Sequence, residues 1–216
     1  MTACRLAWWV MPPGTIPRRS LLSMVIQMND IQAAESRPKD KLIVATAALC
    51  GCFGCHMSLL DIDERILQLV ELVEFDRTPL TDIKTIGKCD IGLIEGGVAN
   101  ADNVEVLRDF RNNCDVLVAV GACAVNGGVP TMRNQFDLKE CLEEAYIHGI
   151  GVENPHVPND VEIPLLLDQV HPIHEVVRVD YFLPGCPPGA DTIWLFLTEV
   201  IAGNTVNFPY SLIHYD

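Results

Sequence analysis

Four short runs of apolar residues stand out along the chain. They cover residues 42–47, 91–95, 116–120 and 176–183. The first and third runs are almost continuously apolar rather than alternating, which is typical of central parallel strands that are covered on both faces. We therefore predict a β-strand at each of the four runs.

Amphipathic segments lie between these runs and after the last one. Apolar residues recur at helical spacing over residues 59–75, 103–112, 138–145 and 193–201, and each stripe predicts a helix. Strands that alternate with helices predict right-handed crossovers and an α/β fold with an open, doubly wound parallel sheet in three α/β/α layers. Residues 149–173 contain four prolines, and we expect a long loop or an insertion there.

The length of 216 residues suffices for one well-buried α/β domain. We place this domain at residues 41–216 and expect residues 1–40 to form a flexible tail. The Arg18-Arg19 pair resembles an export signal, but no small-residue cleavage site follows it. The uncharged stretch 42–60 is long enough for a membrane span, yet its glycines, cysteines and polar residues suit a strand that runs into a loop. We expect an unanchored, cytoplasmic protein.

The composition indicates a chain that is covered by partners. Hydrophobic residues make up 49% of the chain and charged residues only 20%, which is low for a soluble domain that stands alone. Part of the apolar surface is therefore expected to form an interface. The net charge of −14 argues against binding to nucleic acid or to anionic lipid.

The chain contains an unusual number of cysteines for an intracellular enzyme. An odd total and a cluster within residues 50–55 favour metal ligation in a reducing compartment over a disulfide scaffold. The nine cysteines are Cys4, Cys50, Cys52, Cys55, Cys89, Cys114, Cys123, Cys141 and Cys186.

Four of these cysteines directly follow predicted strands. Cys52 and Cys55 come after the first strand, Cys123 after the third and Cys186 after the fourth. Because the carboxyl ends of parallel strands meet at one edge of a sheet, we expect the four thiols to converge there. Cys50 also lies in the first loop, where it is either an alternative ligand or a neighbour. The C-x-x-C spacing favours Cys52 with Cys55.

The other cysteines are expected to take no part in this site. Cys89 and Cys114 precede their strands and so belong to the opposite edge, while Cys141 falls on the apolar stripe of a helix. We expect all three to pack as small hydrophobic residues. Cys4 belongs to the predicted tail.

Four thiolates suit an iron–sulfur cluster or zinc. A structural zinc site usually takes two close pairs of ligands, whereas this chain offers one pair and two distant single cysteines, which favours the cluster. Glycine stands directly before Cys52, Cys55 and Cys186 and two residues before Cys123, so backbone N–H groups can approach the sulfur atoms.

Glu95 ends the second predicted strand, beside the expected cluster. It is either a solvated loop end or salt-bridge partner, or a group that relays protons or hydrogen-bonds the site. His171 and His174 are placed at the wrong end of the fourth strand and are expected to be ordinary residues. No dinucleotide fingerprint follows any strand, so the chain itself is not expected to bind NAD.

Three separated motifs resemble the proximal-cluster motifs of [NiFe]-hydrogenase small subunits. They are Leu49-Cys50-Gly51-Cys52-Phe53-Gly54-Cys55-His56-Met57-Ser58, Val120-Gly121-Ala122-Cys123-Ala124 with Gly127-Gly128, and Pro184-Gly185-Cys186-Pro187-Pro188. The resemblance is strongest to the small delta subunits of NAD-reducing hydrogenases, and it includes residues 60–65 and 213–216. Three motifs in the right order are far more specific than a single C-x-x-C.

This resemblance implies a flavodoxin-like fold in which Cys52, Cys55, Cys123 and Cys186 bind one [4Fe–4S] cluster. It also implies that a separate large subunit carries the nickel–iron site, and that electrons pass to a diaphorase of flavin and iron–sulfur subunits that binds NAD. Only 30 residues follow Cys186, and none is cysteine, so electrons must leave for another protein. FMN binding, proposed for some members, has no motif here.

Three alternatives stay open at this point. The cluster subunit of respiratory complex I, which is linked to quinone, has a similar fold, but it carries adjacent cysteines where this chain has Cys52-Phe53-Gly54-Cys55. A flavodoxin-like FMN carrier needs no convergent thiols. A scaffold subunit would use its cysteines only for packing.

Overall fold

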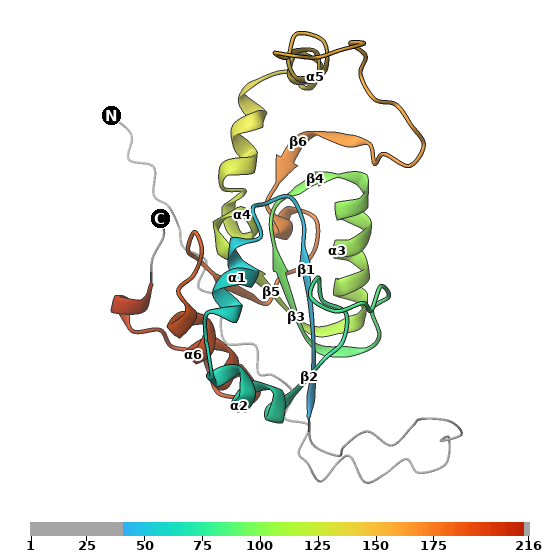
Figure 1. Ribbon diagram of the computed structural model, residues 1–216. Coiled ribbons are helices and arrows are strands. Elements are labelled where there is room, and N and C mark those ends of the chain that lie inside the picture. Colours follow the sequence, from blue (N-terminus) through green and yellow to red (C-terminus); the bar gives the residue numbers. More distant parts are fainter. Residues whose placement is uncertain (1–40, 214–216) are drawn as a thin grey trace, which may run out of the picture. The chain divides into compact units, whose positions relative to one another are not determined.

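A parallel sheet forms the centre of the computed structural model, which describes residues 41–213 (Figure 1). In this part of the chain the sheet has the strand order β2-β1-β3-β5-β7, and every neighbouring pair is parallel. When only the five strands of this sheet are counted along the chain, the order is 2-1-3-4-5, which is the strand order of flavodoxin-like folds. The predicted fold class is confirmed. The strands are β1 (Leu42–Ala48), β2 (Val73–Phe75), β3 (Cys89–Glu95), β5 (Cys114–Val120) and β7 (Tyr181–Leu183).

Helices cover both faces of the sheet, and a short antiparallel pair of strands lies beside it. The pair joins β4 (Val98–Asn100) to β6 (Leu166–His171). None of the helices within residues 41–213 is long and apolar enough to cross a membrane. The helices are α1 (Gly54–Leu60), α2 (Arg65–Leu72), α3 (Ala101–Asn113), α4 (Gly121–Asn126), α5 (Leu138–Tyr146) and α6 (Ala190–Ile201), with 3₁₀ helices η2 (Val129–Gln135), η3 (Ile173–Glu175) and η4 (Tyr210–Leu212).

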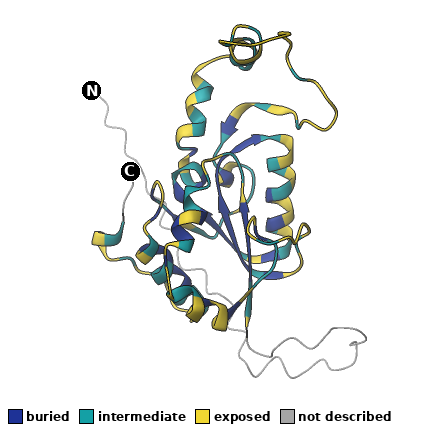
Figure 2. Cartoon of the chain, viewed as in Figure 1, coloured by how far each residue is buried: buried dark blue, intermediate teal, exposed yellow. Residues whose placement is uncertain are grey.

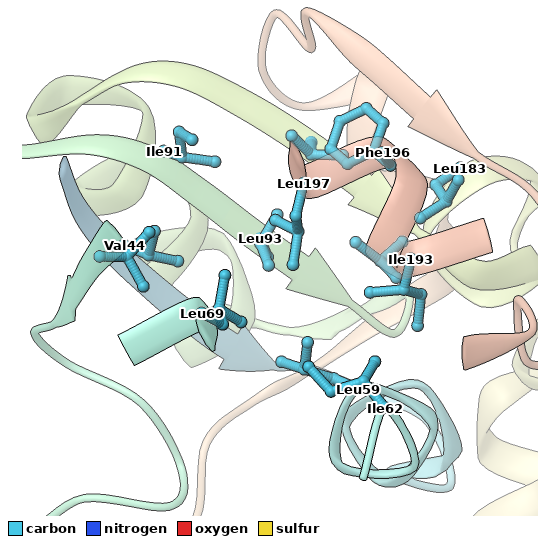
Figure 3. Packing of buried hydrophobic residues seen from close by; sticks show 13 residues of the cluster. Val44, Leu59, Ile62, Leu69, Ile91, Leu93, Leu183, Ile193, Phe196 and Leu197 are labelled. Carbon is cyan, nitrogen blue, oxygen red and sulfur yellow. The ribbon is translucent and has the colours of Figure 1, made fainter. Parts of the chain in front are cut away.

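The side chains of β1, β3 and β5 alternate between two apolar cores. One core packs α1, α2 and α6 against the sheet, and Figure 3 shows Phe196 and Leu197 of α6 facing Leu93 of β3. The other core packs α3 against the opposite face through Leu107 and Phe110, which are both fully buried. Strands covered on both faces explain the continuous apolar runs in the sequence. Figure 2 shows the buried sheet between helices whose outer faces are exposed.

The predicted helix over residues 59–75 is wrong in its extent. The structure places two short helices there, α1 and α2, and the segment ends in the edge strand β2. Val73 pairs with Leu42 of β1 and is buried. Its apolar side chain extends the helical stripe in the sequence, which hides the change from helix to strand.

Two further expectations need correction near the C-terminal half. The predicted strand 176–183 is a strand only at β7, and Asp180 just before it still binds β5, through its N–H to the Leu117 carbonyl and its carboxylate to the Leu117 N–H, both at 2.9 Å. The predicted loop 149–173 contains β6, which pairs with β4. The expected tail, residues 1–40, lies outside the described residues.

Candidate functional site

The loops after β1 and β3 are tied together at the carboxyl edge of the sheet. The N–H of Leu49 donates to the carbonyl of Glu95 at 2.8 Å, and Cys50 and Gly97 exchange two backbone hydrogen bonds of 2.9 and 2.8 Å. These bonds join the loop that carries Cys52 and Cys55 to the end of the second predicted strand.

The loops after β5 and β7 meet at the same edge. The N–H of Ala122 donates to the carbonyl of Gly185 at 2.8 Å. The hydroxyl of Ser58, on α1, donates to the carbonyl of Pro188 at 2.5 Å. The three loops that carry the predicted ligands therefore contact one another, as the parallel topology requires.

Gly121 shows how closely these loops approach the sulfur atoms. It has a φ of +82°, and a Cβ atom built there would overlap the Sγ atom of Cys55. Gly128 behaves similarly, because its Cβ would lie 2.9 Å from the Sγ atom of Cys123. Glycine is required at both positions for the thiols to occupy the space between the loops.

The four predicted ligands differ in exposure and in the ease with which they ionise. Cys52 and Cys186 are exposed, whereas Cys55 and Cys123 are partly buried. Burial raises the pKa of the Cys55 thiol, and the carboxylate of Glu95 raises it further. Burial also raises the pKa of Cys123, with the nearby Cys186 adding to the effect. Both shifts favour the neutral thiol over the thiolate where no positive charge lies nearby.

Glu95 is a buried member of this site, with only 4% of its surface exposed. Its Oε2 atom accepts the backbone N–H of Cys55 at 2.9 Å, and its Oε1 atom lies 2.8 Å from the Nδ1 atom of His56. Burial by itself would raise the pKa of Glu95, but the hydrogen bond and the positive charge that His56 can carry outweigh it, so the pKa lies below its usual value. The interpretation of Glu95 as a solvated loop end is wrong.

Cys50 lies beside the predicted ligands rather than apart from them. It is partly buried, and its charge would also raise the pKa of Cys123. Within residues 41–213, no three His, Cys, Asp or Glu side chains are arranged to bind a single metal ion.

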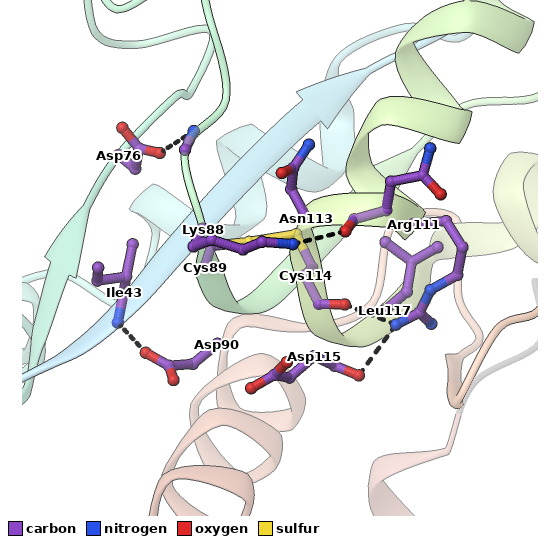
Figure 4. Close-up of a disulfide and its surroundings, with 12 residues drawn as sticks. Ile43, Asp76, Lys88, Cys89, Asp90, Arg111, Asn113, Cys114, Asp115 and Leu117 are labelled. Carbon is purple, nitrogen blue, oxygen red and sulfur yellow. Dashed lines mark hydrogen bonds between the residues drawn. A yellow bond between two sulfur atoms is a disulfide. The ribbon is translucent and has the colours of Figure 1, made fainter. Parts of the chain in front are cut away.

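The prediction that Cys89 and Cys114 are unpaired small hydrophobic residues is wrong in one respect. Both are buried at the opposite edge of the sheet, as expected, but a disulfide joins them (Figure 4). They are direct partners in the register of β3 and β5, with Cα atoms 4.7 Å apart. The sequence does not state this register, so the pairing could not be predicted.

The remaining candidates have other partners in the structure. Cys141 is a free, partly buried cysteine on α5. His171 pairs with Glu175 at 2.6 Å, and His174 packs edge-on against Phe182. His171 ends β6 rather than entering the fourth predicted strand, and a Cβ at Gly97 would lie 3.4 Å from its carbonyl oxygen and 3.5 Å from that of Cys123, so its expected position at the opposite edge is wrong. Cys4 lies outside the described residues.

The sequence interpretation missed His56, Thr46 and Ser58. All three are buried polar residues whose side chains are hydrogen-bonded near the ligand loops. The available signal was the position of His56 and Ser58, one and three residues after a candidate ligand at the start of a helix. Thr46 gave no signal, because a threonine in an apolar strand is common.

Comparisons with known proteins show what this chain is similar to. Residues 52–200 match the family described as NADH ubiquinone oxidoreductase, 20 kDa subunit. The chain is 48% identical over 188 residues to the delta subunit of the NAD-reducing hydrogenase HoxS of Cupriavidus necator, which covers 85% of this chain and 90% of that subunit. It is 35% identical over 173 residues to an iron–sulfur subunit of the F420-non-reducing hydrogenase of Archaeoglobus profundus, covering 71% of this chain and 54% of that one.

A solved structure gives the same result at the level of the fold. A chain in the crystal structure of an NAD+-reducing [NiFe]-hydrogenase in the H2-reduced state superposes with a TM-score of 0.80 at 58% identity. The superposition covers 82% of this chain and 99% of that chain. The family match starts at Cys52 and extends into α6, so it includes all four predicted ligands.

Proposed function

The chain belongs to the family of the 20 kDa subunit of NADH ubiquinone oxidoreductase and is the small electron-transfer subunit of an NAD-reducing [NiFe]-hydrogenase, and we propose that it acts through one [4Fe–4S] cluster. The proposed ligands are Cys52, Cys55, Cys123 and Cys186. When bound, the cluster supplies reversible one-electron chemistry.

The observation that carries this proposal is the meeting of three separate loops around free thiols. Gly121 leaves room for the Cys55 sulfur, and the Ala122–Gly185 hydrogen bond holds the Cys123 and Cys186 loops together. Packing alone does not require four free cysteines at one edge of a sheet.

The residues of this chain then have three tasks. The four thiolates hold the cluster, and the hydrogen bonds between the loops fix their spacing. The apolar cores beneath β1, β3 and β5 exclude water from the inner side of the site. Glu95 and its hydrogen bond to the Cys55 amide keep the first loop in place.

We propose that partner subunits cover the outer side of the site. Cys52 and Cys186 are exposed, and α1 and the segment of η2 present large apolar residues at least half exposed, namely Met57, Val129, Met132 and Phe136. Apolar surface of this kind favours a protein partner. We place the nickel–iron site in a large subunit, and NAD in flavin and iron–sulfur diaphorase subunits of an unanchored cytoplasmic complex.

The substitution Cys186→Ser in the anaerobically purified complex tests the proposal. The variant is expected to lose about four irons per complex and to show only background reduction of NAD by H2, because three thiolates do not hold the cubane. Cys141→Ser, which changes a free cysteine on α5, is the matched control and is expected to behave as wild type.

Full iron content and full H2-dependent NAD reduction in Cys186→Ser would contradict the assignment. A purified protein that contained flavin and no iron would support the FMN carrier instead. Normal iron content with low activity would show that Cys186 acts in assembly rather than as a ligand.

A further inference from the structure

A chain of buried hydrogen bonds runs from the centre of the sheet to the amide of a proposed ligand. The hydroxyl of Thr46, on β1, lies 2.7 Å from the Nε2 atom of His56. The Nδ1 atom of His56 lies 2.8 Å from Glu95, whose other oxygen accepts the N–H of Cys55 at 2.9 Å. Thr46, His56 and Glu95 are each at least 96% buried.

The ring of His56 is held by a stacking contact as well as by the hydrogen bonds at its two nitrogen atoms. The ring of Phe53 stacks on it with centroids 4.7 Å apart and planes that differ by 2°. Phe53 itself lies between Cys52 and Cys55 in the ligand loop. The orientation of the histidine is therefore fixed by the same loop that carries two of the ligands.

The neighbours of His56 determine which nitrogen carries its proton. Within residues 41–213, the hydroxyl of Thr46 has one hydrogen-bond partner, the Nε2 atom of His56. The hydroxyl proton needs an acceptor, so we assign Nε2 as the acceptor and Nδ1–H as the donor to Glu95. In this arrangement the carboxylate of Glu95 accepts two N–H groups, from His56 and from Cys55, and brings a negative charge to this buried series of hydrogen bonds.

This charge lies in surroundings that do not screen it well. A small cavity beside these hydrogen-bonded residues is lined by Leu59, Leu93 and Val120 together with Cys55. Electrostatic interactions are much stronger in apolar surroundings than in water. A negative charge beside a cluster stabilises its more oxidised form and therefore lowers its reduction potential.

The hydrogen bond to Cys55 acts in the same direction. Backbone N–H groups that point to cluster sulfurs raise the potential. Here the N–H of Cys55 donates to the carboxylate of Glu95 instead, so it is not available to a sulfur atom.

We propose that His56 is a positioning residue, which holds the carboxylate of Glu95 against the Cys55 amide and thereby keeps the reduction potential of the cluster low. This inference rests on the proposed function, since it concerns the cluster held by Cys55. His56 acts only through Glu95, whose carboxylate without the Nδ1–H donor is free to turn away from the ligand loop.

The test is a redox titration of the complete, anaerobically purified complex, followed by the EPR signal that Cys186→Ser removes. Glu95→Gln keeps an oxygen that accepts the Cys55 N–H but removes the charge, so the midpoint potential is expected to rise. His56→Gln places its amide near the former Nε2 position and loses the donor to Glu95, so the potential is expected to rise in the same direction.

Two further variants separate positioning from a general structural effect. His56→Asn places an amide donor near the former Nδ1 position and is expected to restore the potential towards wild type. The double variant Glu95→Gln/His56→Gln is expected to match Glu95→Gln alone, because His56 has no other route to the cluster.

Glu175→Gln is the matched control, because Glu175 also pairs with a histidine, at 2.6 Å from His171. Half of its side chain is exposed, so water and salt screen its charge, and the potential is expected to stay unchanged. An unchanged potential in Glu95→Gln or His56→Gln would overturn the proposal, as would shifts that add in the double variant. A wild-type complex without the EPR signal would instead contradict the proposed function.

Discussion

The two edges of the parallel sheet carry cysteines in opposite chemical situations. At the carboxyl edge, Cys55 and Cys123 are free thiols in the first turns of α1 and α4, which follow separate strands. At the amino edge, Cys89 and Cys114 stand directly opposite each other at the starts of β3 and β5 and form a disulfide. Loops that follow strands can gather several groups around a ligand, whereas residues within paired strands meet only their register partner.

Glycine makes room for sulfur at both edges, but the room serves different purposes. A Cβ at Gly92 would lie 2.7 Å from the Sγ atom of Cys114, inside the core that packs α3 against the sheet. A Cβ at Gly121 would overlap the Sγ atom of Cys55, in the space between loops. The first glycine accommodates a cross-link, and the second keeps open the site that we assign to a cluster.

The largest expected effect follows from closing that space. Gly121→Ala places a methyl group where the Cys55 sulfur lies, so we expect loss of the cluster, with the iron content lowered by about four per complex. Gly203→Ala is the matched control, because Gly203 has a similar positive φ of +71° and open space around it. It is expected to cost about 1 kcal/mol of stability and no iron. Equal iron content in both variants would contradict the assignment.

At the amino edge we expect loss of stability without loss of iron. The disulfide closes a loop with a sequence separation of 25, and chain-entropy arguments assign such a cross-link about 3 kcal/mol. The double variant Cys89→Ala/Cys114→Ala is therefore expected to lower the free energy of unfolding by about this amount, measured by denaturant titration. A loss of iron in this variant would show that the two edges are not independent.

A smaller loss of stability is expected at Arg111, which forms hydrogen bonds at the same edge of the sheet. Its guanidinium donates to the carboxylate of Asp180 at 2.6 Å and to the carbonyl of Cys114 at 2.6 Å. Lysine cannot form this fork, so Arg111→Lys is expected to lower the free energy of unfolding by about 1–2 kcal/mol. Arg108→Lys, on the exposed side of the same helix, should change it by less than about 0.5 kcal/mol. Equal losses in the two variants would show that the fork adds nothing.

The strands and the ligand positions could be predicted because they depend on local pattern and topology. Continuous apolar runs identified β1 and β5, and the rule that parallel strands share a carboxyl edge then placed Cys123 and Cys186 in neighbouring loops. The exact ligand set stays a prediction.

The features that escaped prediction depend on contacts between distant residues. Val73 extends a helical stripe but belongs to β2, because pairing with Leu42 outweighs local propensity. The Cys89–Cys114 disulfide depends on the register of β3 against β5. The role of His56 depends on Thr46 and Glu95, which lie 10 and 39 residues away in the chain. The sequence alone does not show that these distant residues are in contact.

The most direct test of the central claim is anomalous scattering at the iron absorption edge from crystals of the assembled complex. The account predicts one iron–sulfur cubane at the carboxyl edge of the sheet, with its irons bonded to the Sγ atoms of Cys52, Cys55, Cys123 and Cys186. A map without iron at that edge, or with Cys50 bonded in place of one of these four, would contradict the account.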